Sequence, residues 1–257
     1  MDSPTILDVS DVTLRFGGVT ALQEASFSLK AGELFAIIGP NGAGKTSIFN
    51  CINGVYRPQN GSILFDGDEL IGESPVSVAR KGVGRTFQNL GLFMNLNLID
   101  NLLLGRHLQM KTGFLSGALW WGRAKNEEIK NRQKIEKIID LLELQPHRYQ
   151  PVGLLPYGIQ KRVELGRALS MEPRILLLDE PVAGMNLEET EDMARYILEI
   201  NNELGISILL VEHDMAMVMD IADCVMALDF GQKIAIGSPK EVQSDQRVIA
   251  AYLGEAS

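Results

Sequence analysis

The 257-residue sequence has little of what marks several large classes of protein. Its two cysteines, Cys51 and Cys224, are too few and too far apart for a disulfide framework or a zinc site. No apolar run approaches the ~18 to 20 residues that cross a bilayer. The first residues, MDSP, lack the basic and apolar regions of a secretory signal. We therefore expect a cytoplasmic chain, which other subunits must hold at a membrane if it works there.

Basic residues are also scarce. The chain has 24 Lys and Arg against 33 Asp and Glu, which gives a formal net charge of −9, and its pI is near 4.9. Non-specific binding to nucleic acid needs a basic surface that displaces counterions, so this balance argues against a nucleic-acid partner. With 46% hydrophobic and 22% charged residues, the composition is that of a globular protein long enough for one or two domains.

The most informative stretch is residues 34–50, LFAIIGPNGAGKTSIFN. An apolar run typical of a strand buried on both faces leads into a turn that fits G-x-x-x-x-G-K-[ST], and a helix follows. The glycines allow consecutive backbone N–H groups to turn inward around an anion, beside the positive end of the helix dipole. Lys45 would reach the β- and γ-phosphates of a nucleotide, and the Thr46 hydroxyl would bind Mg²⁺. The predicted nucleotide-binding residues of this stretch are Gly39, Pro40, Asn41, Gly42, Ala43, Gly44, Lys45, Thr46 and Ser47.

Two later apolar runs also end in polar side chains. Residues 175–178 (ILLL) precede Asp179 and Glu180, and residues 206–211 (ISILLV) precede an EHD sequence with His213 in its middle. In an open α/β sheet such strand ends meet at one crevice. Behind a phosphate loop, an Asp in this position holds Mg²⁺ through its water shell, the Walker B arrangement. The carboxylate of Glu180 is then placed to polarise the attacking water.

The rest of the chain is predicted to form one domain in three consecutive parts. Residues 1–88 contribute an antiparallel subdomain and the first part of a nucleotide-binding core, residues 89–170 a helical lobe, and residues 171–257 the rest of the core and a C-terminal helix. Strand-like runs disappear in the middle part, where Leu and Met spacing suits helices. They return in the last part, which places the lobe as an insertion into the core.

Shorter elements are predicted within these parts. Residues 6–16 alternate apolar and polar from Val9, as a half-buried antiparallel strand does, and Phe16 at its end is placed to stack on an adenine. Residues 241–253 are predicted to form one helix. Further strands are predicted at 22–29, 62–65 and 84–88, a hairpin at 225–235, and helices at 77–81, 98–108 and 129–144.

Taken together, these motifs resemble those of ABC transporter ATP-binding subunits over essentially the whole chain. The resemblance is carried by the phosphate loop, the glutamine at position 88, ILLLDEP at 175–181, and the histidine that follows ILLVE. It implies an α/β P-loop NTPase fold with a mixed parallel core sheet, a small antiparallel β subdomain and an inserted helical lobe. It also implies an ATPase with ATP and Mg²⁺ as cofactors, in which Phe16 stacks on adenine, Gln88 senses Mg²⁺ and water, and His213 contacts the γ-phosphate. The predicted catalytic residues are Glu180, His213 and Gln88, and the predicted metal-binding residues are Thr46, Gln88 and Asp179.

The family's signature sequence is altered in this chain. Family members form head-to-tail dimers in which the LSGGQ signature of one chain closes the nucleotide site of the other; here LPYGIQKR stands at 155–162. Pro156 replaces Ser, Tyr157 replaces the first Gly, and Ile159 replaces Gln, so the usual hydroxyl donor to the γ-phosphate is missing. Gly158 and a helix N-terminus remain to bind phosphate. We predict Tyr157 and Gly158 as nucleotide contacts, and we hypothesise that the site they complete is less active than the site on this chain's own Walker motifs.

Other departures are similar to the ATPases of branched-chain amino-acid importers. These are LPYG in place of LSGG, a KTGFLSG insertion, AGMN after Walker B, and the ending AYLGEA. Such importers pair two different ATP-binding subunits with two multi-span permease subunits and a periplasmic substrate-binding protein. The resemblance therefore implies these partners, no nucleic acid, and a place at the cytoplasmic face of the inner or plasma membrane. ATPases for urea or amide uptake and for lipopolysaccharide export share much of the pattern and stay open as alternatives.

Two further classes of function compete with a transport ATPase. A soluble ABC ATPase that acts on nucleic acid or ribosomes usually carries two ATPase units or long coiled-coil insertions, and this chain has neither. A regulatory switch that binds nucleotide without turnover is disfavoured by the intact Glu180 and His213.

Overall fold

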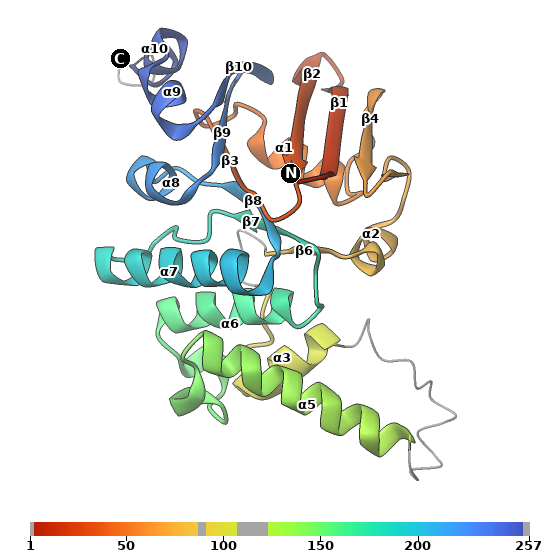
Figure 1. Cartoon of the computed structure of the whole chain (residues 1–257), viewed down its shortest axis with the longest axis vertical. Helices are drawn as coiled ribbons and strands as arrows, with labels where there is room; N and C mark the ends of the chain where they lie inside the picture. The colour runs from red at the N-terminus through yellow and green to blue at the C-terminus, as the bar shows by residue number, and fades with distance from the viewer. Residues whose placement is uncertain (1–2, 87–90, 107–122, 254–257) are drawn as a thin grey trace.

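Two β-sheets with covering helices make up the described part of the chain. A computed structural model describes residues 3–86, 91–106 and 123–253 (Figure 1). The strands are β1 Thr5–Phe16, β2 Val19–Lys30, β3 Leu34–Ile38, β4 Asn60–Phe65, β5 Asp68–Glu69, β6 Val83–Arg85, β7 Ile175–Asp179, β8 Ser207–Val211, β9 Cys224–Asp229 and β10 Gln232–Gly237. The helices are α1 Lys45–Ile52, α2 Pro75–Lys81, α3 Leu98–Gly105, α5 Arg123–Leu141, α6 Tyr157–Leu169, α7 Leu187–Leu204, α8 Met215–Ile221, α9 Pro239–Ser244 and α10 Gln246–Leu253, with 3₁₀ turns at Gln145–His147 and Val152–Leu154.

The larger sheet has six strands in the order β10-β9-β3-β8-β7-β6. Neighbouring strands from β9 to β6 are parallel, and β10 returns antiparallel to β9. Every residue of β3, β7 and β8 is buried, as expected for parallel strands covered on both faces. The three continuous apolar runs in the sequence are thus confirmed as the centre of the sheet. Because these strands run parallel, their carboxyl ends lie along one edge.

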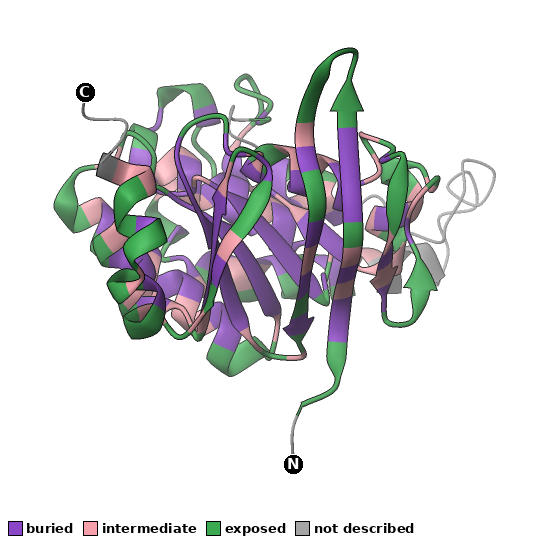
Figure 2. Ribbon diagram, turned by 90° about the horizontal axis from the view of Figure 1, so that it is seen from above, coloured by how far each residue is buried: buried purple, intermediate pink, exposed green. Residues whose placement is uncertain are grey.

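Alternate side chains of the central strands belong to two separate cores. In β3, Leu34 and Ile38 belong to a cluster shared with α6 and α7, whereas Phe35 and Ile37 belong to a cluster shared with β1, β2 and α1. Successive side chains of a strand point to opposite faces, so one apolar run supplies both cores. Figure 2 shows this burial along the sheet strands, with the exposed residues on outer helix faces and hairpin tips.

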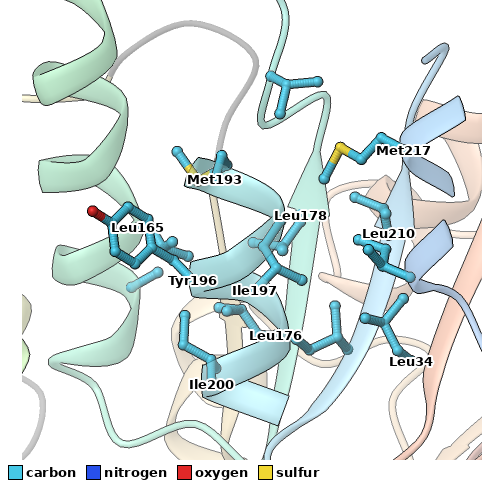
Figure 3. Close-up of a cluster of buried hydrophobic side chains, with 14 of the residues drawn as sticks. Leu34, Leu165, Leu176, Leu178, Met193, Tyr196, Ile197, Ile200, Leu210 and Met217 are labelled. Atoms are coloured by element: carbon cyan, nitrogen blue, oxygen red, sulfur yellow. The ribbon is translucent and has the colours of Figure 1, made fainter. Parts of the chain in front are cut away.

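Helix α7 covers one face of the larger sheet, and its packing against the strands holds the strand ends in place. Its buried side chains include Tyr196 and Ile197, which lie between Leu178 of β7 and helix α6 (Figure 3). The helix begins with a capping box at Asn186 and ends at Gly205, whose φ is 64°. These local signals fix both ends of a helix that packs on the strands bearing the polar side chains.

The smaller sheet is antiparallel, in the order β2-β1-β4-β5. Its hairpin of β1 and β2 leads into the phosphate loop as predicted, whereas β4 and β5 follow that loop in the chain. The alternation of apolar and polar residues in β1 is interrupted between Val9 and Val12, where the pairing with β2 shifts register and Asp11 has a φ of 52°. Such a bulge increases the local twist of the strand. The long hairpin of β1 and β2 lies beside α1 and shares a buried cluster with it (Figure 1).

Helices α3, α5 and α6 lie together on the other side of the molecule from the antiparallel sheet (Figure 1). Leu102 of α3, Ile139 of α5 and Val163 of α6 share one buried cluster. The helices predicted at 98–108 and 129–144 are found as α3 and α5, and the limits of the predicted lobe, 89–170, stay a prediction. Within the described ranges, no helix combines the length and apolar character needed to cross a membrane.

The prediction of one C-terminal helix over 241–253 is wrong. The chain forms α9 and α10, separated by Asp245, whose backbone is extended at φ −72° and ψ 122°. The Asp245 carboxylate accepts hydrogen bonds from the backbone N–H and the guanidinium of Arg247. An Asp side chain that bonds the following backbone competes with the helical hydrogen bonds, and this breaks a helix whose apolar periodicity continues.

Candidate functional site

The turn between β3 and α1 depends on its glycines. Gly39 and Gly44 have φ values of 149° and 104°. A Cβ on Gly39 would lie 2.2 Å from the carbonyl oxygen of Leu228, and one on Gly44 would lie 2.6 Å from that of Ala21. Only glycine fits in either place. Helix α1 then starts with no side-chain hydrogen bond to its first-turn amides among the described residues. Backbone N–H groups arranged in this way fit an anion such as phosphate.

Lys45 places a positive charge at this turn. Its side chain is buried, with 5% of the residue exposed, and Nζ donates hydrogen bonds to the carbonyl oxygens of Gly39 at 2.6 Å and Pro40 at 2.9 Å. The ammonium group is therefore held by the loop's own backbone, next to the start of α1. Phosphate oxygens that enter the loop gain a charge-assisted partner without a large movement of the lysine.

Asp179 is the most deeply buried carboxylate of the site, with 2% exposure. Its Oδ2 accepts a hydrogen bond of 2.9 Å from Nη2 of Arg85, and Nη1 of Arg85 donates to Oδ1 of Asn50 in α1 at 2.7 Å. Burial raises the pKa of Asp179 above its ordinary value, and the Arg85 guanidinium acts in the opposite direction. Asp179 Oδ1 is buried and has no hydrogen-bond partner among the described residues. That oxygen fits a water of hydrated Mg²⁺.

Glu180 and His213 meet from the ends of neighbouring strands. Glu180 follows β7 and His213 follows β8, and Glu180 Oε1 lies 2.9 Å from His213 Nε2. The backbone N–H of Glu180 donates to the carbonyl oxygen of Val211 at 2.8 Å, while its φ of 51° turns the chain sharply away from the strand. A positive φ is uncommon for a residue other than glycine and is found at functional sites. The side chain keeps 16% exposure and reaches the cleft.

The phosphate loop, Glu180 and His213 border one cleft of about 260 Å³, and Asp179 lies outside its lining. Its lining residues are Ala21, Asn41, Gly42, Ala43, Gly44, Lys45, Thr46, Ser47, Glu180 and His213. The structure thus brings together seven of the nine predicted phosphate-loop residues with both predicted catalytic residues that it describes. Gly39 and Pro40 lie behind the cleft, where their carbonyl oxygens hold Lys45. Gln88, the third predicted catalytic residue, lies outside the described residues.

Phe16 lies at the end of β1, on the hairpin that leads to Ala21 of β2. Its side chain is 48% exposed, and its ring meets that of Tyr56 edge to face with centroids 5.1 Å apart. One face of an aromatic ring fixed in this way is available for stacking. The stacking of Phe16 on adenine stays a prediction.

Tyr157 and Gly158 lie apart from the cleft, at the start of α6. Pro156 precedes the helix, and the first-turn amides carry no side-chain cap among the described residues. Tyr157 is 43% exposed; its ring lies against Gly184, where an added Cβ would be 3.3 Å away, and an added Cβ on Gly158 would lie 2.4 Å from Glu189 Oε1. Within one chain, therefore, the signature residues do not line the cleft with the phosphate loop.

The donor set fits ATP and Mg²⁺. Glycine amides, an ammonium group and a helix N-terminus suit phosphate. The Thr46 hydroxyl and Asp179 carboxylate are oxygen donors of the kind that Mg²⁺ shares with phosphates and water. In the described part of the chain, no group of three or more His, Cys, Asp or Glu is placed to hold a metal ion.

Besides Ala21, which lines the cleft, sequence reasoning missed four residues that support the site. Arg85 and Asn50 anchor Asp179, Tyr56 contacts Phe16, and buried Glu212 bonds the backbone around His213. A usable signal was present for two of them. An arginine in a short apolar strand and a glutamate directly after a buried strand both need a partner, since a buried charge without one is costly.

Comparisons with known proteins agree with this geometry. A family model described as "ABC transporter" matches residues 22–183, and one described as "Branched-chain amino acid ATP-binding cassette transporter" matches residues 232–257. The chain is 39% identical over 254 residues to the high-affinity branched-chain amino acid transport ATP-binding protein BraF of Pseudomonas aeruginosa, covering 99% of this chain and 100% of that protein. It is 41% identical over 257 residues to LivG, a protein of the same description from Escherichia coli strain K12, with the same coverage.

Solved structures show the same fold. The ADP conformation of an ATP-binding cassette of an ABC transporter matches with a TM-score of 0.85 and 30% identity, covering 98% of this chain and 100% of that one. A nucleotide-free ATP-binding cassette from an ABC transporter gives a TM-score of 0.83 at 30% identity, with coverage of 96% and 98%. The predicted α/β P-loop NTPase fold is confirmed. The chain belongs to the ABC transporter family, as an ATP-binding subunit that hydrolyses ATP.

Proposed function

We propose that this chain powers a membrane importer for branched-chain or related hydrophobic amino acids. The substrate class rests on the two relatives of that description, which match over their full lengths, and on the C-terminal family model. One structural observation carries the enzymatic part. The phosphate loop, Lys45 and the Glu180–His213 pair border a single cleft.

Each side chain has a defined task in this proposal. The turn amides and Lys45 bind the phosphates of ATP, and Phe16 stacks on the adenine. Thr46, Asp179 and Gln88 would hold Mg²⁺, which would supply positive charge to offset that of the phosphates. Glu180 orients the attacking water and accepts its proton. His213 holds the carboxylate of Glu180 in place and also contacts the γ-phosphate.

A second ATP-binding subunit completes the cleft. Pro156 and Tyr157 at the start of α6 are exposed, although Gly158 is buried, and this helix start does not line the cleft at this chain's own phosphate loop. Tyr157 and Gly158 therefore serve a nucleotide held by another chain. In return, the partner's signature helix closes the cleft described here. Closure of this head-to-tail dimer on ATP and its reopening after hydrolysis provide the mechanical step, and the resemblance to branched-chain amino-acid importers implies that the partner is a different chain.

An exposed apolar patch offers a surface for a permease. Phe93 and Met94 are 56% and 40% exposed, and Leu154 is 80% exposed. The backbone N–H of Gly153 donates to the carbonyl oxygen of Met94 at 3.0 Å, so the two segments lie side by side. We propose that one of the two multi-span permease subunits docks here, which holds the chain at the cytoplasmic face of the membrane and couples the predicted lobe, 89–170, to the permeases. A substrate-binding protein contacts the permeases, and nucleic acid has no part in the cycle.

Purification of the chain from solubilised membranes tests this function. We expect a second ATP-binding chain and two multi-span proteins to co-purify, and the complex in liposomes to accumulate leucine when ATP and the substrate-binding protein are present. A complex with Lys45→Ala serves as the inactive control. Uptake of urea in place of amino acids would change the assigned solute, and recovery of the chain with cytosolic proteins alone would refute the transport role.

A further inference from the structure

Glu212 is a buried carboxylate that bonds two separate loops of the site. The residue is 3% exposed. Its Oε2 accepts hydrogen bonds from the backbone N–H groups of His213 at 2.7 Å and Asp214 at 3.3 Å. Its Oε1 accepts one from the backbone N–H of Val182 at 3.0 Å. One carboxylate thus holds the chain that bears His213 and the chain that follows Glu180.

The contacts of Glu212 close a ring. From Glu180 the backbone passes through Pro181 to Val182, whose amide bonds Glu212. Glu212 continues into His213, whose Nε2 lies 2.9 Å from Glu180 Oε1. A displacement of the loop after Glu180 must therefore pull on the backbone of His213. The distance between the two catalytic side chains is fixed from both sides of the ring.

Burying a charged side chain at this depth costs free energy, and an uncharged side chain would be enough for a purely structural role. A buried ion is tolerated when hydrogen bonds replace its lost hydration. Each oxygen of Glu212 accepts from at least one backbone donor. An amide in the same place would present an NH₂ group to one of these donors, because only one of its two end atoms is an acceptor. Both oxygens are needed to span the two loops.

We propose that Glu212 is a positioning residue for hydrolysis, which sets the His213–Glu180 geometry and couples it to the loop after Glu180. This rests on the roles that the proposed function gives to Glu180 and His213. That loop continues through Gly184, which contacts Tyr157 of the signature, to Asn186 at the start of α7. Glu212 thus links the position of the signature region to the reacting end of the site.

The test replaces Glu212 by Gln in the assembled complex and measures steady-state ATP hydrolysis. We expect kcat to fall about ten- to a hundredfold, the effect of a small misplacement of reacting groups. KM for ATP and nucleotide affinity should stay within about twofold of wild type, because the phosphate loop is untouched. Glu212→Asp, which keeps the charge and shortens the reach, should lose kcat in the same direction and replaces the Gln variant if that one does not fold.

Glu69→Gln is the matched control. Glu69 Oε1 also accepts two backbone N–H groups, from Ile63 at 3.0 Å and Ile71 at 2.9 Å, but in the antiparallel sheet. Its kcat should equal that of wild type. If the Glu69 variant loses as much kcat as the Glu212 variant, the loss reflects general loosening of the fold and the proposal fails.

A double-mutant cycle separates positioning from a merely structural role. If Glu212 acts through His213, adding Glu212→Gln to His213→Ala should slow turnover no further, within about twofold. Additive losses would overturn the proposal, and so would an unchanged kcat in Glu212→Gln while His213→Ala is inactive. In both of those cases the proposed function stands. A wild-type complex that does not hydrolyse ATP would instead refute the proposed function itself.

Discussion

Helices α1 and α6 begin in the same way and in different surroundings. Their N-cap residues, Gly44 and Pro156, make no side-chain cap hydrogen bond, whereas α2, α3, α7 and α8 are capped by Ser74, Asn97, Asn186 and Asp214. Uncapped amides are left for another acceptor. Both starts are the places that the sequence assigns to phosphate.

The two helix starts differ in the side chains that support them. The start of α1 is supported by Lys45, its first residue, and by the ion pair of Arg85 with Asp179. Arg85 also binds Asn50 within the helix. The start of α6 has exposed Pro156 and Tyr157. We propose that the start of α1 is a preorganised phosphate site within its own chain, the strong half, and that the start of α6 is the weak half of a site that needs another chain's nucleotide.

The largest expected effect comes from removing the base of the strong half. Glu180→Gln in this chain should lower turnover at its own site by about 10²- to 10⁴-fold, the usual contribution of a positioned base. Nucleotide affinity should change by less than about twofold, since the loop amides and Lys45 remain. The measurement is ATP hydrolysis by the assembled complex, beside an equilibrium nucleotide titration.

The same substitution at the equivalent position of the partner ATP-binding chain tests the other site of the proposed dimer. In that dimer the partner's site is completed by the Pro156–Gly158 segment, so silencing it should remove the smaller share of total turnover. Equal losses from the two substitutions would break the proposed asymmetry. Near-normal turnover in Glu180→Gln would remove Glu180 from its catalytic role.

The ion pair of Arg85 and Asp179 anchors the strong half, so its removal should lower the stability of the protein. Arg85→Met leaves the 2%-exposed Asp179 without its cation, which should lower the free energy of unfolding by about 3–5 kcal/mol. Arg174→Met is a close control, because Arg174 also pairs with a carboxylate, Asp66, and lies over an aromatic ring, Phe65. That pair is exposed to water, which screens it, so the control should cost much less. Urea unfolding measures both, and equal costs would show that the buried pair is no special anchor.

The sequence predicted the parts of the strong half that depend on short contiguous stretches of the chain. Residues 39–46 are a contiguous motif, and Glu180 and His213 follow apolar strands whose ends must meet in a parallel sheet. The centre of that sheet was predictable for the same reason, since 34–38 and 175–178 are unbroken apolar runs. At Asp245, by contrast, a side chain breaks an apolar helical pattern, against the local signal.

The parts that were missed depend on neighbours in space. Arg85 reaches Asp179 because β6 lies beside β7, although the two residues are far apart in the chain. Glu212 is likewise satisfied by Val182 across the β7–β8 edge. Strand order is set by packing of the whole domain, so single-sequence spacing carries no information on these pairs. The sequence does show charged residues, Arg85 and Glu212, in or next to apolar strands, and this signal indicates that each has a partner.

The smallest expected effect comes from repairing the weak half. Pro156 occupies the N-cap of α6 at φ −53° and ψ 151°, a backbone conformation that Ser also adopts, so Pro156→Ser restores the hydroxyl that the family signature carries. Stability should change by less than about 1 kcal/mol, because a Ser cap contributes ~1 kcal/mol while losing proline frees the unfolded chain by ~0.4–1 kcal/mol. In a complex whose own site is silenced by Glu180→Gln, residual turnover should rise about two- to tenfold, the effect of one added hydrogen bond to phosphate. Pro151→Ser, which precedes a 3₁₀ turn in the same region, should leave residual turnover unchanged. A fall in turnover with Pro156→Ser would mean that the new hydroxyl caps the helix against the phosphate, and that the bare amides of α6 are the functional feature.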